Sequence, residues 1–472
     1  MAEKKPRMFG TAGIRGLTNV EVTPGLALRM ARAFGDWLGN GGLAAVGRDT
    51  RYGAPMLSLA ASAGLVSAGM DVVDCGVIPT GGLAAYLRHA RAKGAVLITG
   101  SHTPPDRIGF IAMLADGAYV PDEVAVNLEE RYDAGEARAT HVPPDRIGSV
   151  RTAHDSLEVY RTFLLEHVDA APIRKRPPKV LVDPANGTAS LVLPGLLREL
   201  GCQVVELNCV PGPVPARPSE PRAKTLGEAC AKVREHGCDL GIATDVDADR
   251  VLFIDASGKT ASEDVIGAVF ADEVLSRAKK KLCVSPINSS GLLDWTCARA
   301  GARIEWCPPG QPATVEAVKR VGAVYSYEES GKYYFAEEAL WCDGPLAALK
   351  MLSLLGREGI TLAQLVARYP SFTQVKVTVE CPDAIKARVM ERLRERWGRE
   401  LVEGRKEDVT IDGLKRVYQD NSWLLLRKSG TEPLVRVYSD AMDAARANAL
   451  VESGKALLAS VMSEVESPEY RP

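Results

Sequence analysis

The sequence Thr99-Gly100-Ser101-His102-Thr103-Pro104-Pro105-Asp106 follows the apolar run from Gly94 to Ile98. A run that is rich in β-branched residues and stops at Thr-Gly predicts a buried strand that ends in a loop, and the two prolines exclude a helix directly after it. Ser101 is therefore expected on a stiff loop at the carboxyl end of a strand, where open α/β sheets bind their ligands. An ordinary turn made of Ser, His and Pro is the competing interpretation of these eight residues alone.

Length, charge and cysteine usage limit the classes of protein to which the chain can belong. The chain has 472 residues, with 58 Lys plus Arg against 60 Asp plus Glu and a net charge of -2. This length fits about three or four ordinary domains, and the balanced charge argues against a nucleic-acid partner, so that any anion site must be local. The ten cysteines are scattered singly, and no apolar signal segment follows the first residues. We therefore expect a cytoplasmic protein with reduced thiols and no membrane segment.

Strands and helices alternate over most of the chain, which is typical of parallel α/β layering. The predicted strands of the first three units include Leu43 to Val46, Met70 to Val73 and Gly94 to Ile98; Lys179 to Val182, Gln203 to Leu207 and Cys238 to Ile242; and Lys281 to Ser285, Arg303 to Trp306 and Ala323 to Ser326. After Tyr369-Pro370 the pattern changes to closely spaced strands and a long final helix. This last unit is predicted to be α+β with an antiparallel sheet.

Three aspartates, Asp245, Asp247 and Asp249, alternate with apolar residues directly after a predicted strand. In an extended segment these carboxylates would point the same way, and they would repel one another unless a hard cation lay between them. A calcium EF-hand would require Gly and Glu where this chain has Arg250 and Ala256. Magnesium is therefore the expected ion, with a solvated acidic turn as the competing interpretation.

Two further loops carry groups that bind phosphate. The segment Gly10-Thr11-Ala12-Gly13-Ile14-Arg15-Gly16 combines glycines, which let backbone N–H groups approach an anion closely, with one guanidinium. The segment from Arg427 to Thr431 supplies a guanidinium, two hydroxyls and a glycine, and Arg436 follows in the next predicted strand. Bidentate arginine contacts, hydroxyls and backbone N–H groups are suited to a phosphate monoester, although a cationic surface turn could look the same.

A fifth loop offers groups for a sugar. Glu328 and Ser330 provide an acceptor and a donor or acceptor two residues apart, which suits adjacent hydroxyls, and Lys332 follows. Taken alone, two acids in a loop are more often simply solvated. Together the four kinds of loop supply a nucleophilic serine, a metal site, a polyol site and a phosphate site. That combination predicts phosphoryl transfer on a sugar phosphate.

The order of these motifs resembles that of the α-D-phosphohexomutase family over essentially the whole chain. The matching segments are Phe9 to Gly16, Thr99 to Pro105, Asp245 to Arg250, Glu328 to Gly331 and Arg427 to Pro433. The resemblance implies a heart-shaped, four-domain molecule with three similar α/β domains and a C-terminal α+β domain like the TATA-box-binding protein. We place the domains at residues 1–153, 154–256, 257–370 and 371–472.

The resemblance also implies a role for each motif. Ser101 would be the phosphoserine and, with Asp245, Asp247 and Asp249, would hold Mg²⁺. Arg15 and Arg250 would face the phosphoryl group, and Glu328 and Ser330 would bind sugar hydroxyls. The non-reacting phosphate would be held by Arg427, Ser429, Gly430, Thr431 and Arg436. The phosphoserine would phosphorylate one end of a hexose monophosphate and recover the other phosphate from the bisphosphate, so a hexose 1,6-bisphosphate is the expected activator.

The serine loop departs from the family's pattern. Thr103 and Ile108 stand where the family usually has asparagines, and Ile111 stands where it has the lysine favoured as general base. Proton transfer would then fall to His102, which could equally just orient the loop, or to Lys332, which replaces the family's usual histidine.

Three further departures bear on the substrate. Val246 and Tyr327 replace glycines, and Gln311-Pro312 lacks the usual basic residue. Because Glu328 and Ser330 would read the C3 and C4 hydroxyls, which glucose and mannose share, we expect both hexoses to be substrates. A phosphoglucosamine or phospho-N-acetylglucosamine mutase is the main alternative. A metal-dependent sugar phosphatase and a non-catalytic sugar-phosphate binder are less favoured. The expected partners are small sugar phosphates, and a homo-oligomer is compatible with the sequence.

Overall fold

The computed structural model describes residues 7–10, 12–399, 403–430 and 432–466, and the chain divides into two compact units. Unit 1 consists of Met1–Glu263, Gly310–Glu316 and Glu329–Val366. Unit 2 consists of Asp264–Pro309, Ala317–Glu328 and Ala367–Pro472. Among the helices of the described residues, none is both long and apolar enough to cross a bilayer.

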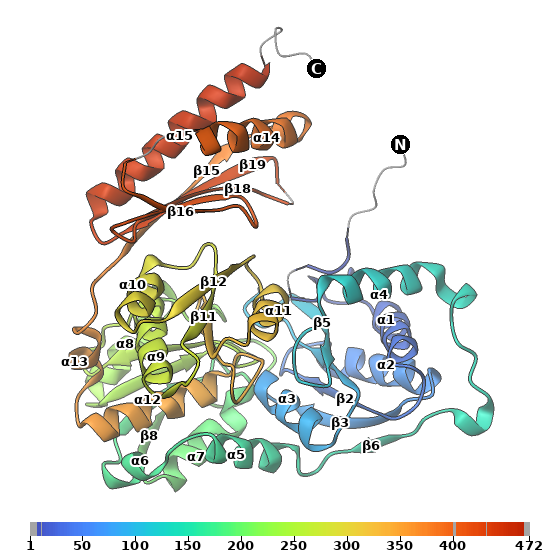
Figure 1. The fold of residues 1–472 in the computed structure, drawn as a ribbon. Coiled ribbons are helices and arrows are strands. Elements are labelled where there is room, and N and C mark those ends of the chain that lie inside the picture. The colour runs from blue at the N-terminus through green and yellow to red at the C-terminus, as the bar shows by residue number, and fades with distance from the viewer. Residues whose placement is uncertain (1–6, 11, 400–402, 431, 467–472) are drawn as a thin grey trace. The chain divides into compact units, whose positions relative to one another are not determined.

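The first sheet of unit 1 has six strands in the order β1-β5-β4-β2-β3-β6. Figure 1 labels β2, β3, β5 and β6 of this sheet. The strands are β1 (Ile14–Leu17), β2 (Leu43–Arg48), β3 (Asp71–Val77), β4 (Gly94–Ile98), β5 (Arg107–Leu114) and β6 (Val150–Thr152). Strands β4, β2, β3 and β6 are parallel, whereas β5 is antiparallel to both β1 and β4. The carboxyl ends of β2 and β4 therefore lie at the same edge of the sheet.

Helices α1 (Pro24–Trp37), α2 (Ala54–Ser67), α3 (Thr80–His89) and α4 (Asp122–Ala134) belong to this part of unit 1. The start of α1 is fixed by its first residues, because the Thr23 hydroxyl accepts from the Leu26 N–H at 3.2 Å and Pro24 fills the first helical position. The apolar faces of α1 and α2 pack into one core with the inner residues of β2, β4 and β5.

The second sheet of unit 1 has the order β10-β9-β7-β8. Its strands are β7 (Lys179–Asp183), β8 (Gln203–Glu206), β9 (Leu240–Thr244) and β10 (Val251–Asp255), and nearby helices are α5 (Ser156–Glu166), α6 (Ala171–Lys175), α7 (Leu193–Glu199), α8 (Gly227–Glu235), α12 (Gly344–Glu358) and α13 (Leu362–Val366). Strands β8, β7 and β9 are parallel, and β10 returns antiparallel to β9. Strand β14 (Lys332–Phe335) also lies in unit 1.

Unit 2 contains a parallel group, β12-β11-β13, and a five-stranded sheet. The first group comprises β11 (Leu282–Pro286), β12 (Arg303–Cys307) and β13 (Tyr325–Glu328), with α9 (Glu263–Arg277), α10 (Gly291–Arg299) and α11 (Gln311–Val321) in the connecting segments. The second sheet is antiparallel, in the order β15-β19-β18-β17-β16, as the sequence predicts. Its strands are β15 (Thr373–Glu380), β16 (Arg405–Val409), β17 (Leu414–Tyr418), β18 (Trp423–Lys428) and β19 (Leu434–Ala441).

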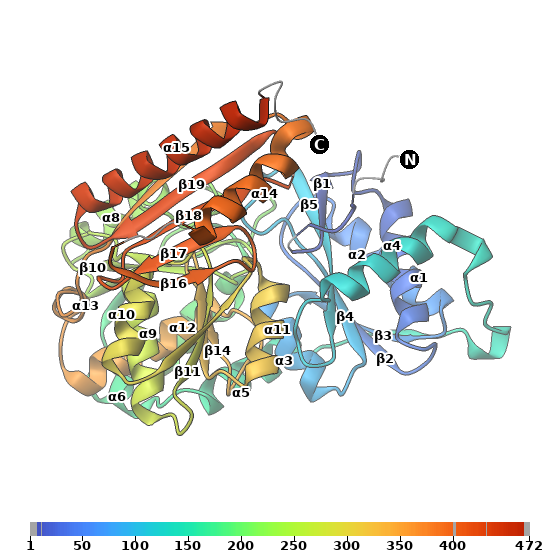
Figure 2. The same cartoon turned by 45° about the horizontal axis from the view of Figure 1, so that its top comes forward.

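Helices α14 (Asp383–Arg399) and α15 (Ala444–Glu466) lie side by side on one face of the five-stranded sheet (Figure 2). Its other face carries a buried cation, because Lys415 has no solvent exposure and lies between two indole rings. The Lys415 ammonium nitrogen is 3.8 Å from the Trp306 ring centroid and 4.5 Å from that of Trp423. Both rings belong to an apolar cluster of unit 2.

Three predicted strands begin too early, for one physical reason. In each, the apolar residue after a left-handed glycine closes the preceding helix instead of opening the strand. Met70 N–H donates to Leu65 O, Cys238 N–H to Val233 O and Ala323 N–H to Val318 O, at 2.9–3.1 Å. This is the six-residue closure of a Schellman motif. The strands consequently begin at Asp71, Leu240 and Tyr325, and β13 continues to Glu328, which is therefore a strand residue and not a loop residue.

Candidate active site

Ser101 lies in the loop between β4 and β5, as predicted, and its side chain is fully buried. Its backbone is left-handed, with φ of +47°, a conformation that is uncommon for residues other than glycine. The Ser101 N–H donates to the Thr99 hydroxyl at 2.8 Å, and the Ser101 hydroxyl donates to Asp245 Oδ2 at 2.8 Å. The loop therefore aims the serine oxygen at the aspartate cluster.

Arg51, which sequence reasoning missed, holds this loop in place. Only 1% of its side chain is exposed, and its guanidinium donates to four backbone carbonyls of the loop. The acceptors are Ser101 O (2.5 Å), Pro104 O (2.6 Å), Thr103 O (2.7 Å) and Arg107 O (2.9 Å). A planar guanidinium can bind several carbonyls at fixed angles, which a lysine ammonium cannot do.

Asp49 completes the clamp from the end of β2. Its Oδ2 accepts from the Thr99 hydroxyl at 2.8 Å and from Gly100 N–H at 2.9 Å, and it lies 3.5 Å from Arg51 Nε. Burial raises the pKa of the Asp49 carboxyl, against the lowering effect of Arg51. The residues that follow β2 thus fix the residues that follow the adjacent strand β4. A search for Asp-x-Arg after a parallel strand could have found this pair.

Asp245, Asp247 and Asp249 form a buried cluster in which one carboxylate oxygen of each lies within 4.8 Å of the others. The segment is a turn between β9 and β10 rather than the extended chain that was expected, because Ala248 takes a φ of +60°. The convergence of the carboxylates is confirmed, although the turn produces it and not strand alternation. Among the described residues, Asp247 Oδ1 has no hydrogen-bond partner. A buried orphan oxygen beside two other carboxylates fits a hard divalent cation such as magnesium.

The three aspartates differ in the direction in which their surroundings shift the carboxyl pKa. Burial, with the charges of the two neighbouring aspartates, raises the pKa of Asp245, and burial with the charge of Asp249 raises that of Asp247. Burial would also raise the pKa of Asp249, but Lys332 and Arg250 lower it to about 2. The Lys332 ammonium donates to Asp249 Oδ2 at 2.6 Å, and Arg250 Nε lies 3.7 Å from Asp249 Oδ1.

His102 points to the same cluster of groups. Its Nδ1 lies 3.3 Å from Arg15 Nη1 and 3.4 Å from the Ser101 hydroxyl. Because arginine can only donate, Nδ1 is the accepting nitrogen. Burial and the charges of Arg250, Arg15 and Lys332 lower the pKa of His102 to about 3, so the ring is neutral at pH 7.

Two residues of the segment before α8 also reach this cluster, and sequence reasoning missed both. The Ser219 hydroxyl donates to Ser101 O at 2.8 Å and accepts from Val246 N–H at 3.2 Å, so it bridges the serine and aspartate loops. Glu220 forms a charged hydrogen bond with Arg250. Unit 1 therefore gathers Ser101, His102, Arg15, Asp245, Asp247, Asp249, Arg250, Ser330 and Lys332, of which Ser330 joins through Arg222.

The predicted phosphate loop lies in unit 2, at the turn between β18 and β19. Arg427 and Arg436 are directly opposite each other across these strands. Arg427 Nε donates to Asp412 Oδ2 at 2.6 Å, and Arg436 Nη2 donates to Glu432 Oε2 at 3.4 Å. Each of the two opposed guanidinium groups is therefore already paired with a carboxylate.

The remaining predicted residues of unit 2 are less informative. Ser429 N–H donates to Leu434 O at 3.0 Å, which closes the turn. Gly430 has open space where a Cβ would stand, so packing does not require glycine there. Thr431 lies outside the described residues. Glu328 ends β13 and is half-buried.

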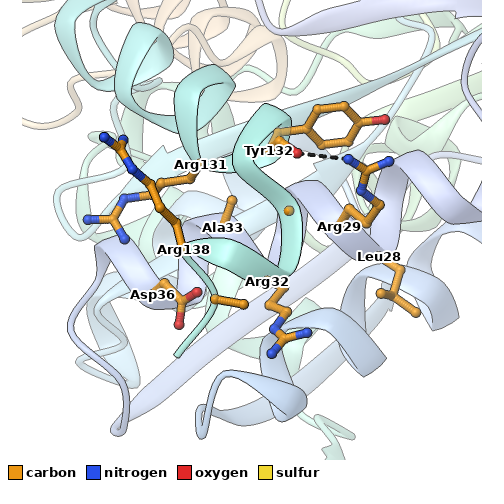
Figure 3. A pocket seen from close by; sticks show the side chains of 10 residues that line it. Leu28, Arg29, Arg32, Ala33, Asp36, Arg131, Tyr132 and Arg138 are labelled. Atoms are coloured by element: carbon orange, nitrogen blue, oxygen red, sulfur yellow. Dashed lines mark hydrogen bonds between the residues drawn. The ribbon is translucent and has the colours of Figure 1, made fainter. Parts of the chain in front are cut away.

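A separate pocket of about 270 Å³ lies between α1 and the end of α4 (Figure 3). It is lined by Leu28, Arg29, Arg32, Ala33, Asp36, Arg131, Tyr132, Gly135, Arg138 and Ala139. Arg29 Nη2 donates to Tyr132 O at 2.8 Å, and Arg131 Nε donates to Asn127 Oδ1 at 2.8 Å. The residues predicted for phosphoryl transfer do not line this pocket, so it is not the predicted reaction site.

Family models of all four domains of the phosphoglucomutase/phosphomannomutase proteins match the chain. The α/β/α domains I, II and III match residues 6–139, 158–258 and 262–372, and the C-terminal domain matches residues 375–454. The chain therefore belongs to this family, within the α-D-phosphohexomutase superfamily. Its class is a phosphohexomutase enzyme with three α/β domains and one C-terminal domain.

Similar proteins differ in the sugars that their names give. A phosphopentomutase from Thermococcus kodakarensis is 37% identical over 462 residues, 98% of this chain and 99% of that protein. A phosphoglucosamine/phosphogalactosamine mutase from Sulfurisphaera tokodaii is 32% identical over 457 residues, 96% of this chain and 99% of that protein. The crystal structure of a phosphoglucomutase/phosphomannomutase family protein from Burkholderia thailandensis is 26% identical with a TM-score of 0.84, covering 96% of this chain and 97% of that chain.

The clamp around the serine loop leads to a test that does not depend on activity. Arg51→Lys keeps the positive charge beside Asp49 but removes the guanidinium group that donates to four carbonyls. Loss of two or more charged hydrogen bonds, each worth about 1.5–3 kcal/mol, should accelerate amide hydrogen exchange over residues 99–107 by about tenfold or more. The matched control is Arg48→Lys, whose arginine is 3.4 Å from Asp74. Equal exchange rates in the two variants would contradict the clamp.

Proposed function

We propose that this enzyme moves a phosphoryl group between C1 and C6 of glucose and mannose through a phosphoserine at Ser101. The observation that carries the proposal is the buried Ser101 hydroxyl, 2.8 Å from Asp245 within a three-carboxylate cluster. A serine oxygen against oxygen ligands for a hard cation is the arrangement that phosphoryl transfer requires. A hexose 1,6-bisphosphate is the activator in this scheme, because it can phosphorylate an unmodified Ser101.

Asp245, Asp247 and Asp249 would hold Mg²⁺ together with the phosphate on Ser101. When bound, this ion would neutralise charge on the transferring phosphoryl group. Arg15 and Arg250 supply donors on the same side, and their charge is available without reorganisation because they are held in place by His102 and by Glu220.

The transfer breaks the bond between phosphorus and Ser101 Oγ and forms a bond from phosphorus to a sugar hydroxyl oxygen. The sugar hydroxyl loses its proton to a base, and Oγ retains the electron pair of the broken bond. His102 is the base that we assign, because its neutral Nδ1 lies 3.4 Å from Oγ. Lys332, the other candidate, is engaged with Asp249. After the bisphosphate has turned round, the same steps in reverse return the other phosphate to Ser101.

We assign the non-reacting phosphate to the loop with Arg427, Ser429, Gly430, Thr431 and Arg436. Arg427 and Arg436 stand opposite each other, and each guanidinium has further N–H groups for a phosphate beside its contact with Asp412 or Glu432. Such a site binds either end of a bisphosphate, since it recognises charge rather than the shape of one sugar.

The choice of glucose and mannose rests on the assignment of Glu328 and Ser330 to the C3 and C4 hydroxyls. A site that makes little contact with C2 distinguishes an axial from an equatorial hydroxyl by about 1–3 kcal/mol at most. The amino-sugar alternative is favoured by the Sulfurisphaera tokodaii relative, and a pentose by the Thermococcus kodakarensis relative.

A side-by-side measurement of kcat/KM separates these substrates. The panel consists of the 1-phosphates of glucose, mannose, glucosamine, N-acetylglucosamine and ribose, with glucose 1,6-bisphosphate present. We expect glucose and mannose to lie within about a hundredfold of each other and to exceed the rest. A hundredfold preference for an amino sugar or for ribose would overturn this choice of sugar and leave the phosphomutase assignment standing.

The role of Ser101 is tested by intact mass spectrometry. The parent protein, incubated with glucose 1,6-bisphosphate, should contain a phosphorylated fraction that is absent from Ser101→Ala, and nearly all mutase activity should be lost with it. Ser67→Ala removes a hydroxyl at the end of α2 and should keep both the phosphate and the activity. A fully active Ser101→Ala protein would refute the phosphoserine.

The metal assignment is tested by binding as well as by activity. Asp247→Asn removes the charge of the carboxylate that carries the orphan oxygen, so Mn²⁺ affinity measured by electron paramagnetic resonance should fall by about tenfold or more. Asp255→Asn, at the end of β10, is the control and should bind normally. Exhaustive chelation should abolish the parent's activity and Mg²⁺ should restore it. Full activity after chelation would exclude the ion.

A further inference from the structure

Arg222 places a positive charge directly on the proposed sugar-binding loop. Its Nη2 donates to the Ser330 hydroxyl at 3.0 Å, from a segment 108 positions earlier in the sequence. Ser330 itself is 6% exposed, whereas the Arg222 side chain is 42% exposed. The Arg222 side chain therefore contacts Ser330 and is also partly exposed to solvent.

A local turn fixes the position of Arg222. The Arg222 N–H donates to the Thr225 hydroxyl at 3.0 Å, and that hydroxyl lies 2.8 Å from Glu220 O. The guanidinium also donates to both carboxylate oxygens of Glu220, with Nε 2.5 Å from Oε2 and Nη2 3.0 Å from Oε1. An arginine held by its backbone and by a carboxylate loses little additional freedom when a ligand arrives.

Glu220 is shared between two arginines, because its Oε1 accepts from both Arg222 and Arg250. The trio of Arg222, Glu220 and Arg250 has a formal charge of +1, which Asp245 and Asp249 offset at the Arg250 end. Burial alone would raise the pKa of Glu220, but its hydrogen bond to Arg222 and the charge of Arg250 lower that pKa to about 2. The net charge of the trio is therefore constant across the pH range in which the enzyme would work.

We propose that Arg222 is a specificity-determining residue that disfavours sugar phosphates with a protonated 2-amino group and favours neutral sugars. This inference rests on the proposed function, in which a sugar hydroxyl binds at Ser330. A cation beside that hydroxyl repels an ammonium on the same ring, whereas it can donate to a neutral hydroxyl or to an acetamido oxygen. The discrimination is then between charged and uncharged 2-substituents and not between small and large ones.

The test compares Arg222→Gln with Lys224→Gln. Both changes remove one positive charge from the same short segment, but Lys224 is an exposed residue and only Arg222 touches Ser330. The quantity measured is the ratio of kcat/KM for glucose 1-phosphate to that for glucosamine 1-phosphate. We expect Arg222→Gln to lower this ratio by about tenfold, the order expected for one partly screened charge, and Lys224→Gln to leave it unchanged.

A pH profile of the parent enzyme keeps the test decisive if Arg222→Gln fails to fold. As the pH rises and the 2-amino group loses its proton, kcat/KM for glucosamine 1-phosphate should rise relative to that for N-acetylglucosamine 1-phosphate. A flat relative profile, or a ratio unaltered in a folded Arg222→Gln, would overturn the role of Arg222 while leaving the mutase assignment intact. A parent enzyme that turns over none of these sugar phosphates would overturn the proposed function itself.

Discussion

The contacts of Arg51 with the carbonyls of the serine loop are the constraint on which the chemistry of unit 1 depends. Ser101 takes a left-handed backbone, a strained state that costs about 1 kcal/mol or more and persists only where its surroundings enforce it. Arg51 enforces it through four acceptors, and Ser219 adds a fifth contact at Ser101 O. In this conformation the Ser101 hydroxyl donates to Asp245 Oδ2 at 2.8 Å.

Once the serine is placed, the balance of charge decides what the aspartate loop can do. Three buried carboxylates repel one another, and burial alone would protonate them. Lys332 and Arg250 draw the negative charge towards Asp249, where the pKa falls, while the pKa values of the other two aspartates rise. The three carboxylate oxygens that converge in this cluster are the ligands that a hard divalent cation prefers.

Much of this arrangement could be predicted from the sequence, because each predicted loop follows a strand with a recognisable apolar pattern. The Ser101 loop and the aspartate turn each follow the carboxyl end of a predicted strand, β4 in the first sheet and β9 in the second. The roles of Arg51 and Arg222 could not be predicted, because these arginines contact residues that lie 50 and 108 positions away in the sequence. Three strands are predicted to start too early for a local reason. In the sequence, an apolar residue after a glycine that ends a helix looks like the first residue of a strand.

The stability of unit 2 depends on pH through Lys415, the lysine that lies between two tryptophans. Burial lowers the pKa of Lys415 to about 7, although Asp294 and Asp440 oppose that effect, whereas the unfolded chain would keep the usual value of 10.5. Between these two values the unfolded state binds more protons than the folded state, so the free energy of unfolding rises with pH through this window. Below pH 7 the folded sheet must hold an ammonium in its core, and the cation–π contacts offset only part of that cost. The Lys415 side chain therefore lowers the stability of the C-terminal sheet as the pH falls from 10.5 to about 7.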